Sequence, residues 1–151
     1  MDDNKGFMAS ITAFIDQGKQ AHQQLPQLLG IKILNRLVMM SPVGNADTWQ
    51  GKAPPGYTGG RFRGNWQVTF DMPAEGETGR IDPSGQLTLT DGNQQLTQFT
   101  RGTRAIYFSN TVPYATRLEF GHSKQAPNGM IRITAAEFQQ FFNQAAKTVK
   151  K

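Results

Sequence analysis

The sequence predicts an α+β domain, in which a small antiparallel β-sheet packs with N-terminal helices and a C-terminal helix. Near both ends of the chain, apolar residues recur at three- and four-residue steps, the spacing of one buried helix face. In the middle, apolar and polar residues alternate, as they do in half-buried strands. A chain of 151 residues suits one core, so we expect residues 1–151 to form a single domain.

The N-terminal part, residues 1–40, is predicted to be helical. Between Gly6 and Gly18 the apolar side chains fall on one helix face. Pro26 suits the first turn of a second helix, whose apolar stripe continues to Met40. Ser41-Pro42 then ends this second helix, because the residue before a proline is biased away from helical geometry.

A long loop is predicted for residues 41–64, which are rich in glycine and proline and show no sustained periodicity. Loops of this length usually serve a function or become ordered against a partner. Trp49 and Tyr57 lie within it, and aromatic side chains on long loops often anchor subunit contacts. We therefore regard both residues as interface candidates.

The part that covers residues 65–133 is predicted to contain the sheet and a short helix. Apolar residues alternate with polar ones in three segments, 65–71, 86–90 and 105–110. Trp66, on the first of these strands, is expected in the core. The three strands together predict a small antiparallel sheet.

The last helix is predicted over residues 134–149. Thr134 and Glu137 have the spacing of a capping box, in which each side chain accepts a hydrogen bond from a free backbone N–H group. Apolar residues follow at helical spacing. Lys147 near the end complements the negative end of the helix dipole.

The composition limits the chemistry that this chain can perform. Sixteen lysine and arginine residues against eleven acidic residues give a formal net charge of +5, which permits contact with polyanions without requiring it. The lack of cysteine excludes disulfides, thiolate nucleophiles and cysteine-ligated metal. The acidic start and the absence of a run near about 18 apolar residues predict neither a signal peptide nor a membrane span.

Enzyme chemistry has one candidate constellation. Glu119 and His122 are three residues apart and could form a proton-transfer pair or two metal ligands. Gly121 between them tends to end a helix, and the other acidic residues form no recognisable metal-binding spacing. The sequence therefore predicts no enzyme, no metal and no cofactor, with a hydrolase built on this pair as a remote alternative.

A basic nucleic-acid-binding module is the main alternative. Arg61 and Arg63 flank Phe62 between glycines, an arrangement that can contact phosphates and stack on bases. Arg101 and Arg104 would extend such a surface. The competing interpretation is that Arg61 and Arg63 pair with carboxylates of this chain or of a neighbour.

Five short motifs follow one another in a fixed order. They are Ser-Pro-Val at Ser41–Val43, Gly-Arg-x-Arg-x-x-Trp within Gly60–Trp66, Val-Pro-Tyr-Ala at Val112–Ala115, Leu-Glu-x-Gly at Leu118–Gly121, and Lys-Gln-Ala-Pro-x-Gly-Met at Lys124–Met130. In this order, the chain resembles the tail-completion proteins of long-tailed bacteriophages, also described as head–tail joining or neck proteins.

The resemblance implies a structural role in the virion. A protein of this family is expected to assemble with itself into a ring, commonly a hexamer, at the top of the tail. The ring joins the tail terminator protein to the connector or stopper protein of the head, and viral DNA passes through it without sequence recognition. The implied location is the virion neck, after assembly in the host cytoplasm.

Within this interpretation, the density of polar side chains between Thr111 and Met130 predicts contacts with adjacent subunits or with the tail terminator. Further candidates come from the long loop. The complete set of interface candidates is Trp49, Tyr57, Arg61, Arg63, Tyr114, Arg117, Glu119, His122 and Lys124.

Overall fold

The computed structural model describes residues 24–44, 58–121 and 123–149. The helix expected between Gly6 and Gly18 lies outside the described residues. In chain order, the described elements are α2 (Gln24–Met40), a 3-10 turn η2 (Arg63–Asn65), β1 (Trp66–Phe70), α3 (Gln86–Leu96), β2 (Ile106–Asn110), α4 (Ala115–Glu119), α5 (Ile131–Ala136) and α6 (Phe138–Val149).

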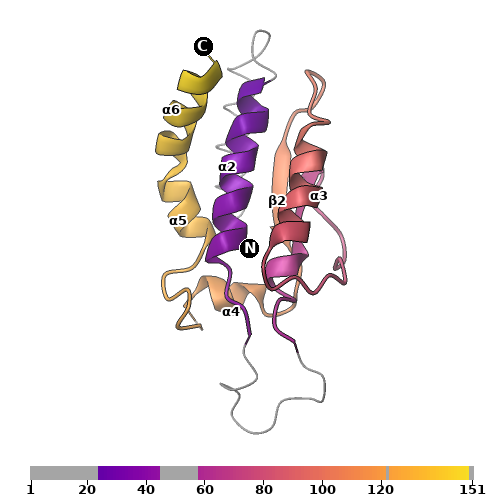
Figure 1. The fold of residues 1–151 in the computed structure, drawn as a ribbon, viewed down its shortest axis with the longest axis vertical. Helices are drawn as coiled ribbons and strands as arrows, with labels where there is room; N and C mark the ends of the chain where they lie inside the picture. Colours follow the sequence, from indigo (N-terminus) through magenta and orange to yellow (C-terminus); the bar gives the residue numbers. More distant parts are fainter. Residues whose placement is uncertain (1–23, 45–57, 122, 150–151) are drawn as a thin grey trace, which may run out of the picture.

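Helix α2 forms the centre of the molecule (Figure 1). It packs against α5 and α6 on one side and against α3 on the other, and α3 in turn contacts β1. The short helix α4 lies across the lower end in this view. Helices packed with a small antiparallel sheet confirm the predicted α+β class.

Helix α2 is held by the apolar face that its sequence predicts. Leu29, Ile33 and Leu37 follow at four-residue steps and are buried. The helix ends at Met40, as expected. Ser41 follows it, and its Oγ donates to the Leu37 carbonyl at 2.6 Å.

The sheet has two antiparallel strands in the described residues, with β1 paired to β2. The register runs from Trp66 opposite Asn110 to Phe70 opposite Ile106. Trp66 is 2% exposed, so its predicted place in the core is confirmed. Two of the three predicted strands are therefore present.

The third predicted strand, residues 86–90, is wrong because this segment is the start of α3. Alternation placed Leu87 and Leu89 on one buried side, yet Leu87 is 61% exposed. The buried face of α3 instead consists of Thr88, Gly92 and Leu96, at four-residue steps. Periodicity in hydrophobicity missed this face because two of its three residues are not large apolar side chains.

The predicted capping box is also wrong. Thr134 lies inside α5, where it is buried and donates from Oγ1 to the Met130 carbonyl at 2.7 Å. Glu137 lies between α5 and α6 and accepts hydrogen bonds from Arg36 of α2, with Nη2 to Oε1 at 3.0 Å. The expected single helix is thus two helices, tied to α2 at their junction.

Candidate assembly interface

The five motif segments are linked to one another at the α4 end of the molecule. Trp66 Nε1 donates to Ser41 Oγ at 2.6 Å, which joins the second motif to the first. Gln125 exchanges two hydrogen bonds with the backbone of Val43, through Nε2 at 2.8 Å and Oε1 at 3.0 Å, which joins the fifth motif to the first. Glu119 of the fourth motif accepts from the backbone N–H of Met130 in the fifth, and Phe62 of the second packs against Tyr114 of the third, so the five motifs build one connected unit.

Arg63 fastens the end of α2 to the segment before α3. Its Nη2 donates to the Ser41 carbonyl at 2.8 Å and to the Met39 carbonyl at 3.3 Å, and its Nη1 donates to the Pro83 carbonyl at 2.7 Å. Such cationic capping of the last carbonyl groups complements the helix dipole. Burial lowers the pKa of Arg63. The described partners of Arg63 are carbonyl oxygens, so the expected pairing with a carboxylate of the same chain is absent from the described residues, and pairing with a neighbour stays a prediction.

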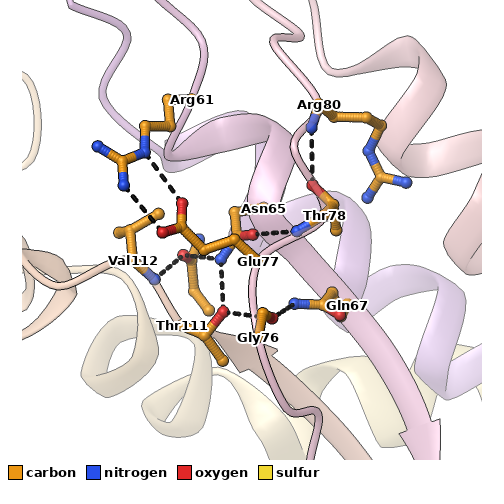
Figure 2. Close-up of polar contacts among 10 residues, drawn as sticks. Arg61, Asn65, Gln67, Gly76, Glu77, Thr78, Arg80, Thr111 and Val112 are labelled. Carbon is orange, nitrogen blue, oxygen red and sulfur yellow. Dashed lines mark hydrogen bonds and ion pairs between the residues drawn. The ribbon is translucent and has the colours of Figure 1, made fainter.

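Arg61 does pair with a carboxylate of the same chain (Figure 2). Its Nε donates to Glu77 Oε1 at 2.9 Å and its Nη2 to Glu77 Oε2 at 2.8 Å, a bidentate geometry. This hydrogen bonding raises the pKa of Arg61 and lowers that of Glu77. The guanidinium carbon also lies 5.5 Å from the ring centroid of Tyr114, whose side chain is half-buried.

Phe62 is unsuited to the stacking role that a nucleic-acid element requires. Its side chain is 4% exposed, and its ring packs edge-on against Trp66 at a centroid distance of 5.8 Å. A base cannot stack on a ring that the core already covers. The Arg61, Phe62 and Arg63 element therefore acts as a structural junction within this chain.

A buried polar network holds the segment after β1 against the strand ends (Figure 2). Asn65 is 1% exposed and donates from Nδ2 to Asn110 Oδ1 and Thr111 Oγ1, both at 3.0 Å. Its Oδ1 accepts from the Thr78 backbone N–H at 2.8 Å. Thr111 Oγ1 in turn donates to the Gly76 carbonyl at 2.7 Å. Because Asn65 satisfies both ends of its amide, this network is stabilising rather than costly.

Glu119 is an internal anchor, and its prediction as an outward contact is wrong. The side chain is buried, with Oε1 accepting from the backbone N–H groups of Met130 and Ile131, both at 2.8 Å. Its Oε2 accepts from the backbone N–H of Arg132 at 3.0 Å and from Arg132 Nε at 3.1 Å. Gly129 permits this approach, because a Cβ there would collide with Glu119. The carboxylate thus joins α4 to the first turn of α5.

Three interface candidates, and one half of the hydrolase alternative, are residues that the structure does not describe. Trp49, Tyr57 and His122 lie outside the described residues, so their predicted roles stay predictions. The hydrolase alternative needed Glu119 as a proton-transfer group or a ligand. That carboxylate instead accepts four hydrogen bonds from groups of this chain.

The outward-facing part of this unit is cationic and aromatic. Arg117 and Lys124 are exposed, and Phe120 is 60% exposed. The guanidinium carbon of Arg132 lies 4.7 Å from the Phe120 ring centroid, a cation–π geometry. Sequence reasoning missed Phe120 and Arg132, because only the fold brings the start of α5 against the end of α4.

Comparisons with protein-family models, with curated proteins and with solved structures gave no match. Within the described residues, no helix combines the length and apolar character that crossing a membrane requires. The same part of the chain holds no group of three side chains of the types that commonly bind metal ions.

Proposed function

We propose that this chain is a tail-completion protein, a structural subunit that forms a ring joining a phage tail to the head connector. The observation that carries this proposal is the ordered set of five motifs, whose segments are linked into one unit. Ser41, Arg63, Trp66 and Glu119 join separate parts of that unit to each other. A joining protein requires such a unit, because it must transmit force between neighbours without unfolding.

The surface chemistry of this unit also supports a protein partner. Arg117, Lys124 and Phe120 face outward, whereas the nearby Glu119 carboxylate is buried. Cations and an exposed aromatic ring suit an acidic protein surface. The nucleic-acid alternative loses its stacking residue, because Phe62 is in the core, and the charge of Arg61 is paired with Glu77.

The proposal is tested by mixing the purified protein with phage tails that lack heads. Its mass is measured by light scattering alone and in the mixture, and the tails are then imaged by electron microscopy. We expect either a ring in solution or a monomer that adds a collar to the tail tip. A protein that stays monomeric and leaves tail tips bare would refute the joining role.

Two double variants that remove the same number of cations from opposite ends test whether collar formation depends on the position of the charge or only on the net charge. Arg117→Gln with Lys124→Gln removes two cations from the α4 end. Arg104→Gln with Lys147→Gln removes two exposed cations from the loop before β2 and from the last turn of α6, which lie at the opposite end (Figure 1). We expect the first variant to lose collar formation and the second to retain it. Equal loss in both would mean that only net charge matters.

A further inference from the structure

Two exposed surfaces of this molecule have complementary chemistry. The first, which we call the cationic platform, consists of Arg117, Phe120, Lys124 and Arg132. The second, the acidic loop, is residues 71–77, which follow β1 and carry an exposed Glu75 and a Met72 that is 68% exposed. In Figure 1 the segment after β1 runs down the right side, whereas the segment after α4 lies at the lower left.

Two of the three cations of the platform, Arg117 and Lys124, have no carboxylate partner within the described residues, whereas Arg132 pairs with Glu119. Glu119 is the nearest acidic residue in the sequence, but its side chain is buried and already accepts four hydrogen bonds. Across residues 24–44, 58–121 and 123–149, neither Arg117 nor Lys124 forms an ion pair. The platform therefore offers cations and an aromatic face to an outside anion.

The acidic loop is held in a defined shape by contacts at both of its ends. At the first end, Asp71 Oδ1 accepts from the backbone N–H groups of Arg104 and Ala105, at 2.7 Å and 3.1 Å. At the second end, Glu77 forms its bidentate pair with Arg61. Glu75 lies between these fixed points and, within the described residues, forms no ion pair. A loop ordered before binding loses less conformational entropy when it docks.

We propose that the acidic loop of one copy docks on the cationic platform of the next copy. Glu75 would pair with Arg117 and Lys124, and Met72 would approach the exposed ring of Phe120, a favourable sulfur–aromatic combination. Because the two surfaces consist of different residues, this contact is heterologous, and repetition of it closes a ring when the rotation allows. The inference rests on the proposed function and names the contact that would build the ring.

Site-directed cross-linking tests the contact directly, because the natural chain contains no cysteine. Glu75→Cys and Arg117→Cys are introduced together, and the protein, alone and on headless tails, is treated with a short bis-maleimide. We expect a ladder of covalent oligomers from the double variant and only dimers from a mixture of the two single variants. Glu75→Cys combined with Arg104→Cys is the control, and it should give no ladder.

A charge exchange gives an independent readout on the same assembly. Glu75→Arg alone and Arg117→Glu alone should each reduce ring or collar formation at least about tenfold, because like charges would then face each other. The two substitutions together should restore most of it, since the pair is re-formed with reversed sign.

The outcomes separate this inference from the proposed function. Tails that gain a collar without any Glu75→Cys to Arg117→Cys cross-link would overturn the contact while leaving the joining role intact. Cross-links from Arg117→Cys to a different tail protein would likewise overturn it, because the platform would then serve another partner. Bare tails and a monomeric protein would refute both.

Discussion

Four charged side chains of the motif segments differ in burial and in role. Glu119 and Arg63 point inward and satisfy backbone groups from other elements, so they determine the local path of the chain. Arg117 and Lys124 point outward and leave their charge available. One-dimensional spacing cannot separate these groups, because the partners of Glu119 are backbone N–H groups more than ten residues away.

Replacement of Glu119 by glutamine should destabilise the fold by about 2–4 kcal/mol. The amide replaces one acceptor oxygen with a donor, which leaves backbone N–H groups at the start of α5 unpaired and removes the partner of Arg132. The free energy of unfolding in urea at pH 7 measures this loss. The control is Asp91→Asn, which weakens an ion pair whose carboxylate is 62% exposed and should cost at most about 1 kcal/mol.

Asp82 should make the stability of this protein sensitive to acid. Burial alone would raise its pKa, but hydrogen bonds from Thr88, Gly85 and Ser84 together outweigh this effect, so the pKa lies below its ordinary value of 3.8. A lowered pKa means that the carboxylate stabilises the fold above its unfolded pKa. This contribution is then lost as the pH falls through the lower folded value.

Asp82→Asn should therefore cost about 1–3 kcal/mol at pH 7, and the cost should shrink below about pH 4. The amide cannot accept both from Thr88, through its backbone N–H and hydroxyl, and from Gly85. Urea unfolding of the natural chain and the variant, measured at intervals from pH 7 to pH 3, gives both values. A cost that stays constant over this range would contradict the assignment.

At the scale of elements, two helical glycines let α2 and α3 pack closely. A Cβ on Gly30 of α2 would lie 2.6 Å from Leu96 Cδ2, and one on Gly92 of α3 would collide with the side chain of Leu34. Leu34 and Leu96 are fully buried, so neither has free space to move into. The absent side chains therefore set the separation of these two helices.

Gly92→Ala should destabilise the protein by about 1–3 kcal/mol, because overpacking outweighs the gain of about 1 kcal/mol in helix propensity. The same substitution in a Leu34→Ala background should cost less, since the space is then open. Gly102→Ala serves as the control, because a Cβ there would meet only Thr100 Oγ1, at 3.8 Å. Urea unfolding of the natural chain, the three single variants and the double variant is the measurement, and additive costs of Gly92→Ala and Leu34→Ala would contradict this account.

The same packing explains which elements could be predicted from the sequence. Helix α2 and strands β1 and β2 bury large apolar side chains at regular steps, so the hydrophobic pattern of the sequence predicted these elements correctly. Helix α3 buries Thr88, whose hydroxyl donates to Asp82 at 2.7 Å, and Gly92, whose missing side chain admits Leu34. Neither Thr88 nor Gly92 counts as a large apolar residue in a hydrophobic pattern. The segment therefore resembled an alternating strand until tertiary packing identified its buried face.

At the scale of the whole molecule, exposed cations lie at both ends, but they have different surroundings. The α4 end adds an exposed phenylalanine and a connected structural unit to Arg117 and Lys124. The opposite end carries Arg104 on a loop and Lys147 in the last turn of α6. The net charge was evident from composition, whereas this difference between the ends depends on how distant segments meet.

Assembly should weaken as salt rises, because the proposed contact between copies pairs exposed charges. The Debye length falls from about 10 Å at 0.1 M salt to about 3 Å at 1 M, which screens such pairs strongly. The unfolding free energy of the chain should change much less, since its core is apolar. Light scattering and urea unfolding over the same sodium chloride series separate the two effects, and assembly that strengthens with salt would indicate a mainly apolar contact.

Binding of short single-stranded DNA in the same series distinguishes the alternative function. Non-specific DNA binding also weakens with salt, but it follows the number of cations rather than their surroundings. Arg117→Gln with Lys124→Gln and Arg104→Gln with Lys147→Gln remove equal charge, so both should reduce any DNA affinity similarly. Only the first pair should reduce assembly on tails. If both double variants lost DNA binding and assembly on tails to the same extent, the result would favour a polyanion-binding protein, because the position of the cations would then have no effect.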